Sequence, residues 1–268
     1  MKSLYDNYSL NATTMKLIAV FLMVLDHIYQ MFSPLGAPVW LNWLGRPVLI
    51  IFLFIVTESF HHTSNRKAFL LRLLLASCLM SVFNQILGSY ILPNDQVVLF
   101  NNAFAVMFVT GLYMLFWDIL QDGVRNKKAG KILASIALFF LPILTIIPIQ
   151  LATGMSQENL LLFQITLSAA LMLPNILFVE GGPLLILLGV LFYVFRTKRL
   201  AQVIVLVVIS AVVMASGGYQ WLMVMAAIPI LLYNGEKGRG MKHFFYIIYP
   251  THIYLLYIIA TLILTKQI

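Results

Sequence analysis

The 268-residue chain has few charged residues and a single cysteine. Only 10% of its residues are Asp, Glu, Lys or Arg, whereas 62% are hydrophobic and the mean hydropathy is +0.96. Because a water-soluble domain carries about 25% charged residues, this composition excludes one and indicates a polytopic membrane protein. The lone Cys78 excludes an internal disulfide and has no partner for a metal site, so we interpret it as a packing residue and expect no metal.

Acidic residues are scarcer than basic ones, with nine Asp and Glu against 17 Lys and Arg, giving a formal net charge of +8. The basic residues cluster in short segments between apolar runs, where Lys and Arg act as topology signals, so nucleic acid is not an expected partner. Other short segments between apolar runs hold no Lys or Arg. These are 34–40, 93–96, 151–157 and 217–219. This asymmetry predicts a multi-pass protein whose N-terminus is cytoplasmic.

The apolar runs predict an all-α polytopic membrane protein of about nine to ten transmembrane helices in one bundle. A span needs about 20 apolar residues, and the candidates are 14–33, 41–60, 68–92, 97–119, 130–150, 158–178, 182–196, 200–216, 218–233 and 242–265. Placing every basic loop on one side requires one of 158–178 and 182–196 to be re-entrant or interfacial, leaving about nine crossings. No link is long enough for a soluble domain, so we predict one domain over residues 1–268.

The first span carries Asp26 and His27 more than halfway along its length. An ionised carboxylate in hydrocarbon costs several kcal/mol, so such a pair is expected to face a polar interior. One interpretation is a polar pair that holds helices together. The other is a proton-handling pair, in which Asp26 or another buried carboxylate orients the imidazole of His27 and raises its basicity.

Polar residues also mark the two ends of the second span. Arg46 lies near its start, where it either reaches the interface or acts as a multi-donor group inside, and Glu58 lies about three turns further along. The next segment places Arg66, Lys67 and Arg72 beside His62. Such a basic mouth suits a phosphate-bearing ligand, although many loops of this kind only fix topology.

The last span contains a proline and several polar rings. Pro250 removes a backbone hydrogen bond in mid-helix, and Tyr249 and His252, at i and i+3, are expected on one face. Aromatic belts explain tyrosines near a membrane interface, but they do not explain a histidine deep in the span.

Five motifs in this order resemble the TraX family, which is named for a membrane protein that acetylates the N-terminus of conjugative pilin. They are Leu-Met-x-Leu-Asp-His, Gly-Arg-Pro with Glu-Ser-Phe-His-His-Thr, Arg-Leu-Leu, Tyr-Asn-Gly, and Phe-Phe-Tyr-x-x-Tyr-Pro-x-His. The resemblance implies a bacterial cytoplasmic membrane protein that takes acetyl-CoA from the cytoplasm and modifies an acceptor on or beyond the membrane. It also implies site residues at matching positions: Asp26, His27, Arg46, Glu58, His62, Tyr249 and His252.

These observations give one mechanism and two rival functions. The donor phosphates would bind at the inner basic residues His62, Arg66, Lys67, Arg72 and Lys242. His27 would deprotonate an acceptor amine or hydroxyl, or be acetylated itself, and Arg46 or a buried tyrosine would stabilise the oxyanion. The acceptor could be a peptide N-terminus, a glycan or a lipid. Alternatives are a proton-coupled permease, which also uses intramembrane charges, and an assembly factor without chemistry.

Overall fold

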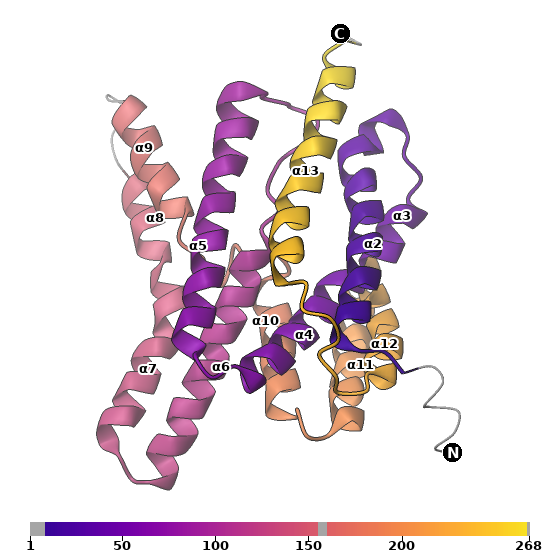
Figure 1. The fold of residues 1–268 in the computed structure, drawn as a ribbon. Coiled ribbons are helices and arrows are strands. Elements are labelled where there is room, and N and C mark those ends of the chain that lie inside the picture. Colours follow the sequence, from indigo (N-terminus) through magenta and orange to yellow (C-terminus); the bar gives the residue numbers. More distant parts are fainter. Residues whose placement is uncertain (1–8, 155–159, 267–268) are drawn as a thin grey trace. The chain divides into compact units, whose positions relative to one another are not determined.

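The computed structural model describes residues 9–154 and 160–266, and in these ranges the chain is helical without a β-sheet (Figure 1). An isolated parallel bridge joins Leu10 to Tyr233. The predicted all-α class is therefore confirmed. Contacts divide the chain into two compact units, each of which is described by itself below. The prediction that the chain forms one domain stays a prediction.

The first unit comprises Met1–Glu58, Ile91–Leu99 and Leu191–Ile268. Its elements are α2 (Ala12–Phe32), η1 (Ser33–Leu35), α3 (Trp40–Gly45), most of α4 (Val48–His62), α11 (Arg199–Ala215), η3 (Tyr219–Ala226), α12 (Ala227–Leu232) and α13 (Lys242–Leu264). Helix α2 packs against both α3 and α13, and α11 packs against η3 and α12 (Figure 1).

The second unit comprises Ser59–Tyr90 and Phe100–Val190. Its elements are α5 (Arg66–Gln85), the π-helical turn η2 (Ile86–Ile91), α6 (Ala103–Arg125), α7 (Ala129–Leu144), α8 (Ile146–Thr153), α9 (Leu160–Leu171) and most of α10 (Gly182–Val194). Asparagines join α5 to the start of α6, because Asn84 donates to the carbonyl of Asn101 at 2.9 Å and Asn102 donates to that of Ser77 at 3.0 Å.

Helix α2 forms because a polar cap precedes a long apolar run. The side chain of Asn11 accepts a hydrogen bond from the backbone N–H of Thr14 at 2.9 Å, which satisfies one of the free donors of the first turn. Its buried face repeats every four residues, as Met15, Ala19, Met23, His27 and Met31, each no more than 4% exposed. His27 thus occupies a core position of the helix.

Six helical segments are long and apolar enough to cross a membrane: Ala12–Leu35, Trp40–His62, Arg66–Ile91, Ala103–Arg125, Ala129–Thr153 and Phe244–Leu264. The predicted nine to ten spans are not confirmed. The other predicted spans contain shorter apolar helices, of which the longest, α11, has 17 residues and a length of about 25 Å, less than the roughly 30 Å of a hydrocarbon core. The predicted span 97–119 also begins too early, because Asn102 caps α6.

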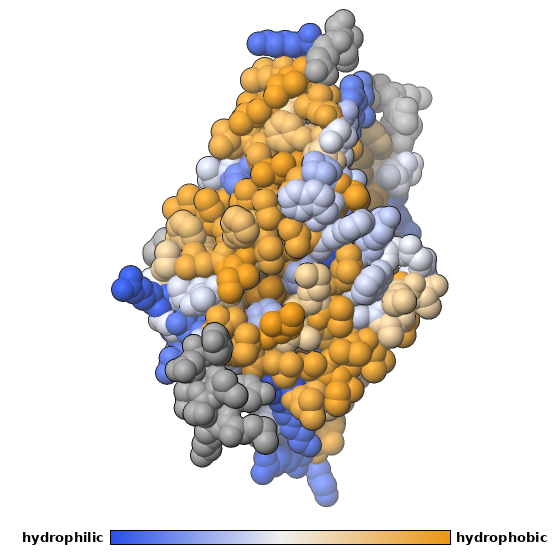
Figure 2. Space-filling model, turned by 90° about the vertical axis from the view of Figure 1, so that its right-hand side faces the viewer, coloured by the Kyte–Doolittle hydropathy of each residue, from blue (hydrophilic) through white to orange (hydrophobic). Residues whose placement is uncertain are grey.

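Exposed apolar side chains follow the helices in stripes, as a membrane protein requires. On α5, Leu71, Leu75, Leu79 and Phe83 lie at intervals of four residues and are each more than half exposed. Hydrophobic residues also predominate on the face drawn in Figure 2. Exposed apolar stripes on helices that are long and apolar enough to cross a bilayer indicate a membrane protein.

Candidate active site

The imidazoles of His27 on α2 and His252 on α13 form a hydrogen-bonded pair in the first unit. Nδ1 of His27 lies 2.7 Å from Nε2 of His252, and the ring centroids are 4.9 Å apart. Both side chains are buried, with residue exposures of 3% and 7%. The α2–α13 contact therefore places two titratable rings inside the protein, where each needs a polar partner.

The protons of this pair follow from its hydrogen bonds. Nδ1 of His252 lies 2.6 Å from the carbonyl oxygen of Ile248, and because a carbonyl only accepts, this nitrogen carries a proton. In a neutral ring Nε2 of His252 is then the acceptor, so Nδ1–H of His27 donates to it. The network thereby assigns the lone pair of His27 to Nε2, which is the nitrogen a general base requires.

Tyr249 lies beside both rings. Its ring centroid is 6.4 Å from that of His27 and 6.0 Å from that of His252, and it is 6% exposed. The predicted common face of Tyr249 and His252 on α13 is therefore confirmed, since both are buried against α2. The phenol adds a polar group next to the histidine pair.

Asp26 holds Arg46 in an ion pair. The Nη2 atom of Arg46 lies 2.8 Å from Oδ1 of Asp26, which also accepts from the amide of Asn42 at 3.1 Å, while Oδ2 accepts from Gln30 at 3.2 Å. Gly45 makes this approach possible, because a Cβ atom there would overlap the side chain of Asp26. The hydrogen bonds thus assign Asp26 to Arg46, whereas the sequence predicted that Asp26 or another buried carboxylate would orient His27.

Helix geometry explains this difference. Consecutive residues point about 100° apart on a helix of 3.6 residues per turn, so Asp26 and His27 face different neighbours. Asp26 faces α3 and its extension at Arg46, and His27 faces α13. The orienting group of His27 is therefore His252, and the two partners of the α2 dipeptide come from opposite ends of the chain.

Arg46 is fixed by three hydrogen bonds. Besides Asp26, its Nε donates to the backbone carbonyl of Asn42 at 3.1 Å and its Nη1 donates to Gln220 at 3.1 Å. A guanidinium has five N–H groups, so the described contacts leave two of them for a ligand. The Arg46 side chain is 22% exposed. Arg46 is thus a fixed donor and not a side chain extended into solvent.

Glu58 belongs to a separate cluster. Its Oε1 lies 3.6 Å from Nη1 of Arg199, whose guanidinium stacks over the rings of Phe54 at 4.6 Å and Tyr233 at 5.1 Å. Burial raises the pKa of the Tyr233 phenol, the Glu58 charge raises it further, and the positive charge of Arg199 opposes both. Glu58 lies about 15 Å along α4 from Val48, and no described contact joins it to the histidine pair.

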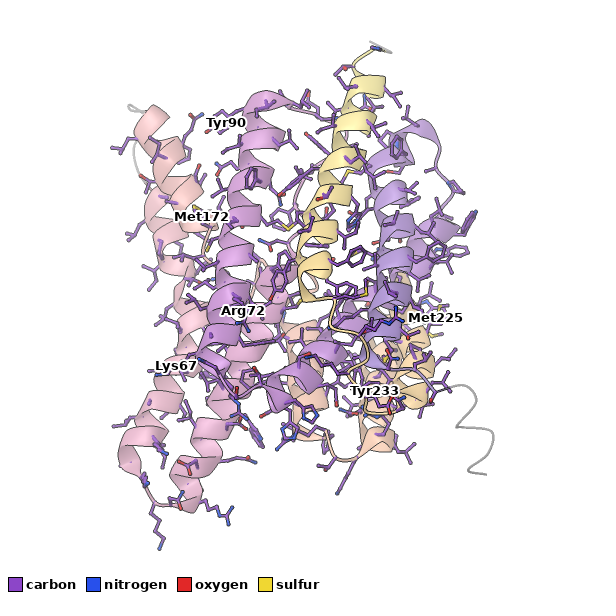
Figure 3. The ribbon with its side chains drawn as sticks, viewed as in Figure 1. Lys67, Arg72, Tyr90, Met172, Met225 and Tyr233 are labelled. Atoms are coloured by element: carbon purple, nitrogen blue, oxygen red, sulfur yellow. The ribbon has the colours of Figure 1, made fainter. Side chains whose placement is uncertain are left out.

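The residues predicted to bind the donor phosphates lie mostly in the second unit. Arg66 forms an ion pair of 2.5 Å with Asp118 and stacks over Phe60. Lys67 and Arg72 are exposed on α5 (Figure 3), and His62 is exposed at the end of α4. Lys242 begins α13, but its side chain lies outside the described residues.

Three polar partners in the site were not predicted from the sequence. Gln30 lies four residues after Asp26, a spacing that could have indicated it. Asn42 and Gln220 come from α3 and η3, and nothing in their local sequence distinguishes them from other polar residues near helix ends.

The fold and this site define a helical membrane protein with a buried histidine pair next to an arginine–carboxylate pair. The chain belongs to the TraX family, whose model, described as TraX protein, matches residues 11–145 and again 124–260. The predicted resemblance is therefore confirmed. A probable fimbrial assembly protein FimC, serogroup H1, from Dichelobacter nodosus is 24% identical over 270 residues, covering 93% of this chain and 96% of that relative. No solved structure matches the chain.

Proposed function

We propose that this chain is an integral-membrane acetyltransferase that moves an acetyl group from cytoplasmic acetyl-CoA to an acceptor on or beyond a bacterial cytoplasmic membrane. The proposal includes a cytoplasmic N-terminus. The TraX family and the relative named as a fimbrial assembly protein favour the N-terminal amine of a pilus subunit as acceptor. The observation that supports this chemistry is the buried chain of hydrogen bonds from His27 to His252 and from His252 to the Ile248 carbonyl, which puts the lone pair of His27 on Nε2.

His27 takes a proton from the acceptor amine through Nε2. The nitrogen of the acceptor amine then attacks the thioester carbonyl carbon, so that a C–N bond forms and an oxyanion develops on the carbonyl oxygen. When the C–S bond breaks, the imidazolium of His27 returns the proton to the departing thiolate. General acid–base catalysis of this kind typically contributes about 10²–10⁴-fold to a rate.

His252 positions His27 and shares its charge. Its Nε2 accepts the Nδ1 proton of His27, which fixes the orientation and the tautomer of that ring. The Ile248 carbonyl keeps His252 in the required tautomer. Arg46, held by Asp26 and Gln220, directs its two remaining N–H groups to the developing oxyanion. Donors fixed in advance lower the reorganisation that the transition state requires.

The hydrogen bonds also bear on the proton-coupled permease. A proton conduit needs a group beyond His252 that can take up a proton and release it. Nδ1 of His252 instead donates to a backbone carbonyl, so the described chain of hydrogen bonds ends there. This end point supports a histidine that acts as a local general base more than it supports the proton path of a permease.

The test is acetyl transfer by the purified protein in sealed proteoliposomes. Acetyl-CoA labelled in its acetyl group is supplied on one side, together with a membrane-inserted peptide that carries a pilin-type free N-terminus. We expect label in the peptide and release of free coenzyme A thiol. Protein that binds no acetyl-CoA, and that instead acidifies or alkalinises the lumen when a solute gradient is applied, would support the permease.

A further inference from the structure

A glycine-rich basic loop connects α12 to α13 and has no role in the mechanism above. It reads Asn-Gly-Glu-Lys-Gly-Arg-Gly over residues 234–240, directly after Tyr233 (Figure 3), and every residue of it is exposed. Among the described residues, Lys237 and Arg239 form no ion pair, in contrast to Arg46, Arg66, Lys131 and Arg199. The loop therefore presents two cations without carboxylate partners.

The loop is fixed to the start of α2 through its carbonyl oxygens. The backbone N–H of Ala12 donates to Glu236 at 2.8 Å, and the hydroxyl of Thr13 donates to Arg239 at 2.6 Å and lies 3.0 Å from the carbonyl of Lys237. Gly238 has a φ of +68°, and a Cβ atom there would overlap the side chain of Asn11. With its carbonyls turned toward α2, the loop leaves its basic side chains exposed.

A third cation lies next to this loop on α2. Lys16 is half-buried, its ammonium lies 5.3 Å from the centre of the Phe245 ring, and it is close enough to Lys237 for the two positive charges to repel. The carboxylate of the loop, Glu236, accepts a hydrogen bond from the Asn234 amide at 3.2 Å. Like charges close to one another favour a bound anion, because the anion reduces their repulsion.

The loop is also in line with the histidine pair. Lys16 and His27 are 11 residues apart, which is close to three helical turns, so they share one face of α2 about 16 Å apart. His252 lies about 15 Å along α13 from the end of the loop. The cations and the base therefore lie at two levels of the same α2–α13 pair, all within the first unit.

We propose that Lys16, Lys237 and Arg239 bind the phosphate groups of the coenzyme A donor, with the pantetheine arm running along α2 and α13 toward His27. This site rests on the proposed function and extends it, because it assigns the anionic head of the donor to the first unit. It narrows the sequence prediction, which spread the donor phosphates over several basic residues that include Arg66, now paired with Asp118.

The test is binding of coenzyme A to the full chain in neutral detergent. The variant Lys237→Gln/Arg239→Gln should bind coenzyme A at least tenfold more weakly than wild type at low salt, with a shallower salt dependence. The matched control Lys127→Gln/Lys128→Gln removes two exposed cations from the α6–α7 link and should stay within twofold of wild type. Thr13→Val, which keeps every charge but releases the loop, should also weaken binding.

Three results would overturn this site alone. One is unchanged affinity in the Lys237/Arg239 variant while wild type still transfers acetyl groups, which would leave the proposed function intact. Another is an equal loss in the Lys127/Lys128 control, which would indicate general charge attraction. The last is a loss confined to binding of phosphatidylglycerol micelles, which would identify the loop as a lipid-headgroup contact. Absence of coenzyme A binding by wild type would overturn this site and the proposed function together.

Discussion

His27 and His252 are joined by a 2.7 Å hydrogen bond although 224 residues separate them in the chain. The bond connects the first and last long helices of the first unit, and its direction is set by the Ile248 carbonyl. In the neutral state each ring carries its proton on Nδ1, which donates to the Ile248 carbonyl in His252 and to His252 in His27, so the lone pair of His27 lies on Nε2.

His252 should act through the position and tautomer of His27. Glutamine at 252 places an amide oxygen near the site of Nε2 and can accept from His27, whereas alanine cannot. We therefore expect His252→Gln to retain several-fold more transfer activity than His252→Ala. The rate-against-pH profile should shift for both variants, because the imidazole that shares the charge of His27 is gone. Equal activities with unshifted profiles would indicate that His252 only fills space.

The proposed activity should require the planar guanidinium group of Arg46 as well as its positive charge. Arg46→Lys keeps the ion pair with Asp26 but loses the geometry that reaches Asn42 and Gln220 together. We expect kcat to fall by about 10²-fold, the range for loss of an oxyanion donor, with a smaller change in the KM for acetyl-CoA. Arg125→Lys, at an exposed position at the end of α6, is the control and should be neutral. A near-wild-type kcat for Arg46→Lys would assign Arg46 to structure alone.

Glu58 and Arg199 should contribute to stability more than to chemistry. Their side chains are 13% and 28% exposed and lie 3.6 Å apart, so a double-mutant cycle with Glu58→Gln and Arg199→Gln should give a coupling of about 1 kcal/mol in thermal unfolding. Folded Glu58→Gln protein should keep most of its transfer activity. Loss of transfer activity in Glu58→Gln with unchanged stability would instead support the catalytic role that the sequence predicted for Glu58.

Tyr233 should make the fold sensitive to alkali. Its pKa is raised by burial and by Glu58 above the ordinary value of about 10, so the unfolded phenol ionises first as the pH rises. The contribution of the neutral Tyr233 phenol to the free energy of unfolding is complete below about pH 10. It is lost as the pH rises through the pKa of Tyr233 in the folded state. Tyr233→Phe should reduce this alkaline loss, measured by thermal unfolding from pH 8 to 11. Tyr219→Phe, an exposed control, should not change it.

The sequence was sufficient for the all-helical class and the family, and it indicated some of the polar residues of the site but not Gln30, Asn42 or Gln220. Intramembrane Asp26, His27, Arg46 and His252 are costly in hydrocarbon, so their presence alone indicated a polar interior. Their pairing was not predictable, because adjacent residues on a helix face different neighbours and a single sequence does not say which helix lies beside which. The predicted number of spans was not confirmed, because short apolar helices such as α11 have the composition of a span without its length.

The most direct test of this account is the transfer rate of His27→Gln with acetyl-CoA and the pilin-type peptide, measured beside His61→Gln as a control at an exposed histidine. We predict that His27→Gln binds coenzyme A like wild type and transfers at least 10²-fold more slowly, and that His61→Gln transfers at the wild-type rate. A His27→Gln protein that transfers acetyl groups at the wild-type rate would contradict the assignment of His27 as the base.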